Sequence, residues 1–270
     1  GVNKHHEKGE VVAKALMAGN DIMLLPQDMA ASIKAINRYL AEGLLQQATL
    51  DASIKKVLRS KYRLGLTSPQ RVELRNVRAD LNTVEAHNMK RELIENALTL
   101  VRNKEDLIPF KSVSNLNMAT LALGASGMTT FQKTIGNYSS MEHLQAGKEV
   151  STSKRDQLLR QLKKKSVVVV SIHDMSSYAK KKFGISESQK QLIEALQKET
   201  KVVLVVFGNP YALQYFDNVD WVLEAYSEDE VTEESAAQAL FGVFGIRGRL
   251  PVTASAKSKF NDGITTNALF

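Results

Sequence analysis

The sequence contains no cysteine, which excludes a disulfide framework, a thiolate metal site and a cysteine nucleophile. Aromatic residues make up only 6% of the chain, too few to suggest a platform on which nucleic-acid bases could stack. The longest apolar runs, such as Val202–Phe207, fall far short of the roughly 20 residues that a membrane-spanning helix needs. No signal-peptide pattern opens the chain, so its compartment is undetermined.

Basic residues outnumber acidic ones by 36 to 29, and the excess is concentrated between residues 154 and 190. Lys163–Lys165 precede a predicted strand at Ser166–Ile172, and Lys180–Lys182 follow it. The two clusters therefore lie roughly 20 Å apart, at opposite ends of that strand. We interpret them as two solvated ends and expect no nucleic-acid partner. A polyanion-binding protein, whose affinity would fall steeply with salt, is the alternative.

From about Thr83 onward, short apolar runs alternate with helical patterns. The runs are rich in Val, Leu and Ile and lack a clean polar alternation, which is typical of strands covered on both faces. Helices lie between them, one of them opened by a capping box of Ser186 and Gln189. The pattern predicts an α/β fold with a doubly wound, mostly parallel sheet sandwiched by helices. The predicted strands are Leu98–Val101, Met118–Leu123, Val167–Ile172, Val202–Phe207 and Trp221–Ala225.

The first 66 residues follow a different pattern. Helices are predicted at Glu10–Met17 and Ala30–Leu40, with one buried strand at Asp21–Leu25 between them. A third helix would be capped by Thr49 or Asp51. A single strand among helices cannot close a sheet, so this part resembles the tail of a larger domain.

Three motifs have both a structural and a functional interpretation. Gly124–Gly127 follows a predicted strand and could cradle a phosphate, although a structural turn is favoured. The acidic residues of 228–234 stand at a predicted helix start, where they favour capping over a catalytic carboxylate pair. The five histidines lack metal-helix spacing, so we predict no metal and no cofactor. His173 and Asp174 lie just past a parallel strand, where open α/β sheets place ligand contacts.

Several stretches, in the right order along nearly the whole chain, resemble glycoside hydrolase family 3. The first two resemble the last strand and closing helix of that family's catalytic (β/α)8 barrel. The next two resemble the entry to its α/β sandwich domain, and the last three resemble the end of that domain. The stretches are Ala18–Pro26, Lys61–Leu66, Glu95–Asn103, Leu107–Phe110, Gly208–Tyr211, Ala236–Gly242 and Gly248–Thr253.

The resemblance implies four segments. Residues 1–66 would be the helical remnant of the barrel, 67–82 a linker, 83–254 the α/β sandwich domain and 255–270 a C-terminal linker. Asp262–Thr266 resembles the connector through which such enzymes continue into a serine β-lactamase-like domain. The implied partners are therefore a carbohydrate substrate, the rest of the barrel and possibly that further domain.

The family branch determines which catalytic residues are expected. In the β-N-acetylhexosaminidase branch, the resemblance implies a retaining mechanism with an Asp nucleophile and a His assisted by an Asp, all upstream of Asp21–Leu25. In the β-glucosidase branch, an acid/base Glu comes from a sandwich-domain loop. The corresponding loop, His173–Tyr178, has no Glu, and the next one is Glu187. We therefore favour the hexosaminidase branch, acting on terminal β-linked N-acetylhexosamine in glycans or cell-wall fragments.

On this interpretation the chain carries no catalytic residue and is inactive alone, since a covalent glycosyl intermediate needs the nucleophile. Strand-end positions make His173, Asp174, Gln27 and Asp28 the candidate substrate-binding residues at the rim of the sugar pocket. Two alternatives remain open: a β-glucosidase-type member of the same family, and a free-standing nucleotide- or phosphate-binding module that uses Gly124–Gly127.

Overall fold

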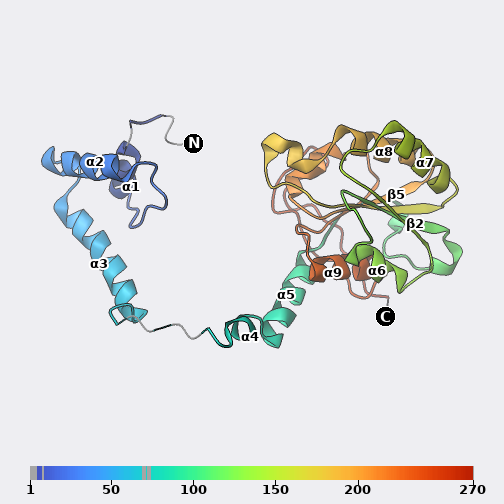
Figure 1. Ribbon diagram of the computed structural model, residues 1–270, viewed down its shortest axis with the longest axis horizontal. Helices are drawn as coiled ribbons and strands as arrows, with labels where there is room; N and C mark the ends of the chain where they lie inside the picture. The colour runs from blue at the N-terminus through green and yellow to red at the C-terminus, as the bar shows by residue number, and fades with distance from the viewer. Residues whose placement is uncertain (1–4, 8, 69–70, 72–73, 270) are drawn as a thin grey trace. The chain divides into compact units, whose positions relative to one another are not determined.

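The computed structural model describes residues 5–7, 9–68, 71 and 74–269 (Figure 1). The chain divides into two compact units, Gly1–Val77 and Arg78–Phe270, here called the N-terminal and the C-terminal unit. The boundary falls inside the predicted linker 67–82, of which Pro69 lies outside the described residues.

The N-terminal unit is built from three helices: α1 (Glu10–Met17), α2 (Met29–Ala41) and α3 (Gln47–Arg63). α1 packs on α2, and Glu10 reinforces the contact with an ion pair to Arg38 at 2.8 Å. The buried side chains of this small core are Ala13, Leu16, Ala35, Tyr39 and Leu45. Five buried side chains make a core far smaller than that of the C-terminal unit.

Two predictions for the N-terminal unit are wrong. Asp21–Leu25 is not a strand, and Leu24 and Leu25 are 86% and 94% exposed. A strand needs a hydrogen-bonded neighbour, and the described residues of this unit supply none. α3 begins at Gln47 with Gln46 as its N-cap, so neither Thr49 nor Asp51 caps it.

The C-terminal unit is an α/β sandwich around a six-stranded sheet, which confirms the predicted fold class. The strand order is β1-β6-β5-β4-β2-β3; β1 runs antiparallel to β6, and all the other neighbours are parallel. The strands are β1 (Thr99–Asn103), β2 (Met118–Leu123), β3 (Glu142–Ala146), β4 (Val167–Ile172), β5 (Lys201–Val206) and β6 (Trp221–Glu224).

Helices cover both faces of this sheet (Figure 1). α7 (Thr152–Leu162) and α8 (Glu187–Gln197) lie on one face, and α6 (Thr130–Gly136) and α9 (Glu230–Leu240) lie on the other. α5 (Val84–Ala97) packs beside α9, and the short α4 (Val77–Leu81) precedes it. Four short 3-10 segments complete the unit: Lys104–Asp106, Val113–Asn115, Ala179–Gly184 and Pro210–Tyr215.

The central strand β4 shows why its sequence begins with an uninterrupted run of valines rather than an alternation of apolar and polar residues. Val168 and Val170 enter the core beneath α7 and α8, whereas Val167 and Val169 enter the core on the opposite face. Successive side chains of a strand point to opposite faces, so a strand buried on both sides needs apolar residues at every position.

Some boundaries differ from the predicted ones for identifiable reasons. β3 and α6 have no counterpart among the predictions, because β3 is a short, mostly half-exposed edge strand that mixes polar and apolar residues, and α6 spans only 7 residues. Thr83 caps α5, and its hydroxyl accepts from the Ala86 amide at 3.1 Å. The capping box of Ser186 and Gln189 is present as predicted.

The last described residues, in the segment predicted as a linker (255–270), run against the C-terminal unit. The amide of Ile264 donates to the Leu100 carbonyl at 2.8 Å, and that of Leu269 donates to the Gly242 carbonyl at 2.7 Å. The half-buried guanidinium of Arg102 reaches the Ser258 hydroxyl at 2.9 Å. A polar sequence does not reveal such contacts, because most of them are made by the backbone. Phe270 lies outside the described residues.

None of the helices in the described ranges is both long and apolar enough for a membrane span.

The two-sided core predicts a large effect of truncation in β5. Leu204 is fully buried beneath α8, so Leu204→Ala should lower the free energy of unfolding by about 2–5 kcal/mol. Leu93→Ala, on the exposed face of α5, is the matched control and should change it by no more than about 0.5 kcal/mol. Urea denaturation of both variants measures the difference; equal midpoints would contradict the two-sided core.

Candidate functional site

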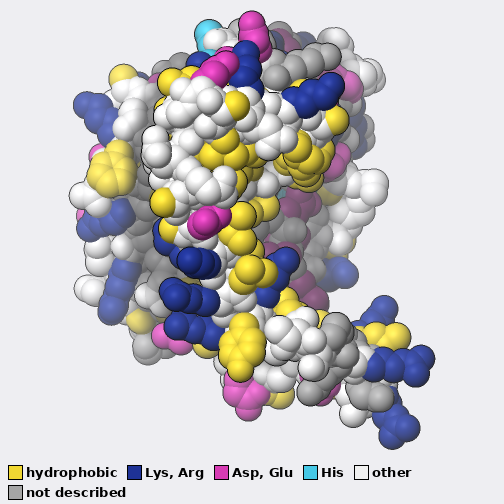
Figure 2. Space-filling model, turned by 90° about the vertical axis from the view of Figure 1, so that its left-hand side faces the viewer, with side chains coloured by type: hydrophobic (Ala, Val, Ile, Leu, Met, Phe, Trp, Pro, Cys, Tyr) yellow, Lys and Arg dark blue, Asp and Glu magenta, His cyan; other side chains and the backbone are white. Residues whose placement is uncertain are grey.

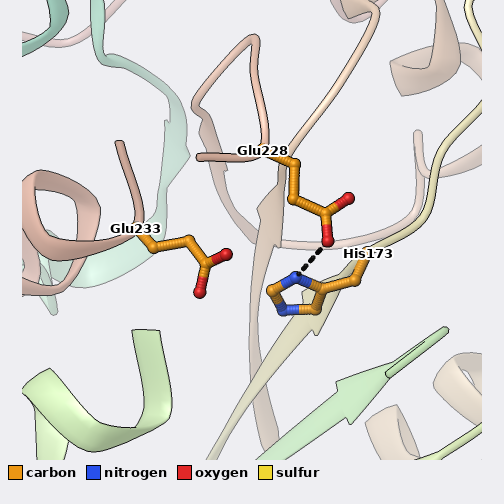
Figure 3. Close-up of side chains that lie close together, drawn as sticks. All are labelled: His173, Glu228 and Glu233. Atoms are coloured by element: carbon orange, nitrogen blue, oxygen red, sulfur yellow. Dashed lines mark hydrogen bonds and ion pairs between the residues drawn. The ribbon is translucent and has the colours of Figure 1, made fainter. Parts of the chain in front are cut away.

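The carboxyl ends of the parallel strands bring three ionisable side chains together (Figure 3). His173 follows β4, Glu228 follows β6, and Glu233 lies in the first turn of α9. One imidazole nitrogen of His173 and one carboxylate oxygen from each glutamate all lie within 4.8 Å of one another. We call His173, Glu228 and Glu233 the strand-end cluster.

His173 forms the buried centre of this cluster. Its side chain is 2% exposed and stacks on Phe207, with ring centroids 5.0 Å apart. Its Nδ1 lies 3.2 Å from Glu228 Oε1, and its Nε2 lies 2.9 Å from Ser171 Oγ. Hydroxyl, imidazole and carboxylate thus stand in the order of a nucleophilic triad. Ser171, however, is wholly buried within β4, where no substrate reaches it, so the arrangement positions Glu228 instead.

Glu228 connects the buried His173 to the exposed residue Asp174. Its Oε2 accepts a hydrogen bond from the Asp174 amide at 2.6 Å. Asp174 has a φ of 51°, in the left-handed region that few non-glycine residues adopt. Its carboxylate is 70% exposed and pairs with Lys148 at 2.8 Å. Of the two predicted rim residues on this edge, Asp174 is therefore exposed, whereas His173 is buried and contacts Glu228.

Glu233 completes the cluster from the helical side. It is 8% exposed, and its Oε2 accepts from the Phe131 amide at the start of α6, at 2.8 Å. Burial raises the pKa of Glu233, and the nearby carboxylates of Glu228 and Asp229 raise it further. The Phe131 hydrogen bond and the His173 ring oppose this pKa rise.

The capping interpretation of the acidic stretch holds for Asp229 and for Glu230, which lies in the first turn of α9. Asp229 is the N-cap of α9 and accepts from the Thr232 amide at 3.3 Å. Burial would raise the pKa of Asp229, but its bonds to Lys90, Thr232 and Ser227 lower it. Glu228 and Glu233 belong to the strand-end cluster instead. The sequence separation of Glu228 and Glu233 from His173 does not predict that they meet. Their contact depends on the order of β4, β5 and β6 in the sheet.

Gly124–Gly127 forms a turn. Gly124 has a φ of +89°, and a Cβ at this position would collide with the His173 carbonyl, so only glycine fits. Two of the backbone amides at the start of α6, where an anion would bind, already donate to side chains. Phe131 donates to Glu233, and Gln132 donates to the Thr129 hydroxyl at 3.1 Å. This geometry favours the structural interpretation over a phosphate site.

The other two predicted rim residues, Gln27 and Asp28, belong to the N-terminal unit. Both line a hollow of about 520 Å³ together with apolar residues such as Val12 and Ile22. Asp28 is also the N-cap of α2, where its carboxylate accepts from the Ala31 amide at 2.9 Å. His173 and Asp174 thus lie together in the C-terminal unit, and Gln27 and Asp28 lie together in the N-terminal unit.

The sheet order and the helical layers define an α/β sandwich domain, and the strand-end cluster lies at the carboxyl ends of the strands, where open α/β sheets place ligand contacts. The family model "Glycosyl hydrolase family 3 C-terminal domain" matches residues 46–268. The chain belongs to this family.

Curated proteins and solved structures also resemble this chain. The thermostable β-glucosidase B of Acetivibrio thermocellus is 21% identical over 274 residues, which cover 91% of this chain and 35% of that protein. A family 3 β-N-acetylglucosaminidase structure from Paenibacillus sp. str. FPU-7 has a TM-score of 0.66 at 19% identity, over 94% of this chain and 49% of that one. A Listeria innocua β-glucosidase structure with isofagomine has a TM-score of 0.64 at 17% identity, and the match covers 90% of this chain and 38% of that one. The chain thus spans between a third and a half of these proteins, and the structural likeness shows a common fold.

A second buried carboxyl lies at the end of β6. Glu224 is fully buried; its Oε1 accepts from the Tyr226 amide at 2.8 Å, whereas its Oε2 has no partner among the described residues. Burial raises the pKa of Glu224 well above its ordinary value of 4.5, although hydrogen bonds from the Tyr226 and Ala225 amides oppose the rise. At a pH between the unfolded and the folded pKa of Glu224, the folded chain therefore binds a proton here that the unfolded chain releases.

This raised pKa predicts a pH-dependent effect of Glu224→Gln. The contribution of Glu224 to stability is fully present below about pH 4.5 and is lost as the pH rises towards the folded-state pKa. The free energy of unfolding of Glu224→Gln minus that of the wild type should therefore increase with pH above 4.5, by up to about 1.4 kcal/mol per unit. Denaturation between pH 4.5 and 8 measures this difference. Glu92→Gln, on the exposed face of α5, is the control, and an equally flat profile in both variants would contradict burial of a protonated Glu224.

Proposed function

We propose that this chain is the closing part of a catalytic barrel joined to the α/β sandwich domain of a retaining glycosidase, which removes terminal β-linked N-acetylhexosamine from glycans or cell-wall fragments. One observation carries the choice of branch. The segment between β4 and α8, which includes His173–Tyr178, contains no glutamate, and its only carboxylate, Asp174, is paired with Lys148. A proton donor from the barrel, as in the hexosaminidase branch, is consistent with this segment.

The exposed apolar side chains of the N-terminal unit support the barrel interpretation. Ile22 is 63% exposed, and Leu24 and Leu25 are more exposed still. Figure 2 shows hydrophobic side chains at the surface among lysines and arginines. An exposed apolar run next to a hollow is the surface that neighbouring barrel elements would cover. The preceding barrel is thus the intramolecular partner in this proposal, and a serine β-lactamase-like domain after residue 270 is a further proposed one.

The names of several relatives favour a β-glucosidase-type member as the second candidate. Among them are the proteins of Acetivibrio thermocellus and Listeria innocua. In such a member, Glu228, which is 33% exposed at the ligand edge, would be the carboxylate available to the sugar. Both candidates use the same two domains and differ in the sugar and in the origin of the acid.

Turnover of chromogenic sugars tests the proposal. The longer protein that contains this chain should hydrolyse p-nitrophenyl N-acetyl-β-glucosaminide with a kcat/KM at least about tenfold above that for p-nitrophenyl β-glucoside, because a site that hydrogen-bonds the acetamide discriminates against its absence. The 270-residue chain alone should show no turnover. A preference for the glucoside would support the second candidate, and turnover by the chain alone would contradict both.

The rim proposal predicts a selective effect of Asp174→Asn. We expect the KM of the longer protein for its sugar to rise about tenfold, as for the loss of a charged hydrogen bond, with kcat within about twofold. Asparagine also tolerates the left-handed backbone, so the loop should keep its shape. Asp156→Asn, which removes an exposed carboxylate on α7, is the control. Gln27→Ala tests the other part of the proposed rim in the same way, and an unchanged KM in both Asp174→Asn and Gln27→Ala would refute the rim.

A further inference from the structure

We propose that the strand-end cluster is a binding site for one divalent first-row transition-metal ion, with Zn²⁺ as the best-matched probe. His173 would supply Nδ1, and Glu228 and Glu233 would each supply one carboxylate oxygen. Figure 3 shows the two carboxylates and the imidazole turned toward a common centre. This inference does not depend on the proposed glycosidase activity.

The separation of the donor atoms fits a single ion. His173 Nδ1 and Glu228 Oε1 lie 3.2 Å apart, and all three donor atoms lie within 4.8 Å of one another. Ligands that each stand about 2.0–2.2 Å from a tetrahedral ion are roughly 3.4 Å apart. Small rotations of the two glutamate side chains are therefore enough to close the site around an ion.

Each of the three side chains also contacts a second group outside the cluster, which would orient it toward an ion. Ser171 Oγ lies 2.9 Å from His173 Nε2 and can accept its proton, which leaves the Nδ1 lone pair free for a metal. The backbone amide of Asp174 holds the second oxygen of Glu228. The Phe131 amide holds Glu233 in the same way. Such outer partners orient metal ligands and fix the histidine tautomer.

The negative charge of the two glutamates also favours the binding of a cation. Among the described residues, no lysine or arginine forms an ion pair with Glu228 or Glu233, although Lys90 and Arg91 pair with their neighbours Asp229 and Glu234. Two carboxylates side by side in a mostly buried site repel each other unless a proton or a cation lies between them. A divalent ion would neutralise both.

The donor types select the class of metal. One imidazole nitrogen and two carboxylate oxygens suit Zn²⁺ and its transition-metal neighbours, whereas Ca²⁺ and Mg²⁺ prefer oxygen ligands alone. Three protein ligands leave a fourth position for water. The ion would tie the end of β4 to the start of α9, and through Asp174 it would hold the proposed rim.

Metal titration of the 270-residue chain tests the proposal. The chain is stripped with a chelator and carries His5→Ala and His6→Ala, so that these adjacent histidines cannot bind zinc adventitiously. We expect calorimetry to show one Zn²⁺ per chain with a Kd in the micromolar range or below. Mn²⁺ should bind more weakly, in the order expected for such ligands, and Zn²⁺ should raise the thermal midpoint. At roughly tenfold metal excess, binding of less than about 0.2 equivalents of Zn²⁺ would be no more than background. That result would overturn the proposed site.

Matched variants assign the binding to the cluster. Glu233→Gln keeps an oxygen for the Phe131 amide but loses the charge, and we expect Zn²⁺ affinity to fall at least about 100-fold. Glu228→Gln should act likewise, and Ser171→Ala should weaken binding about 10- to 100-fold. Glu234→Gln, one residue further along α9 and paired with Arg91, is the control and should bind as the parent does. Equal affinity in all four variants would mean an adventitious ion only, and the proposal would be wrong.

Discussion

Burial of the central sheet on both faces is the constraint on which the rest of this structure depends. The alternating valines of β4 supply two separate cores, and neighbouring strands are apolar for the same reason. The inner strands of such a sheet expose polar groups mainly at their ends, because helices cover both faces. The chemistry of the C-terminal unit is thus gathered at the edge where β4, β5 and β6 finish.

At that edge, hydrogen bonds from inside the sheet reach the surface. Ser171, within β4, contacts the His173 imidazole, which contacts Glu228, and Glu228 in turn accepts from the Asp174 amide. Each step places the next group, so that an exposed carboxylate in a sparsely populated backbone conformation is held by a buried ring. A packed core thereby fixes the backbone geometry where the strand passes into the loop.

The sequence predicts the parts of this arrangement that depend on local pattern. β2 and β4 begin and end at the predicted residues, since hydrophobicity at every position marks a strand covered on both faces. β3 escapes prediction because its residues are half-exposed and polar at the edge of the sheet. Asp21–Leu25 is apolar enough for a strand, yet pairing requires a neighbour that no local pattern supplies. His173 and Asp174 are found from their strand-end position, but Glu228 and Glu233 are not, because two crossovers separate β4 from β6.

The position of Glu228 links the two proposals made for this edge. One of its oxygens faces His173, and the other holds the Asp174 amide, so the same carboxylate takes part in the buried cluster and in the proposed rim. Whatever neutralises the cluster, whether a proton or a metal ion, draws on the first oxygen and changes the electron density on the second. The strength of the Asp174 hydrogen bond must follow, because a carboxylate shares its charge between both oxygens. On the proposed hexosaminidase function, the C-terminal unit would influence sugar binding through the state of this buried cluster, without contributing a group to the chemical step.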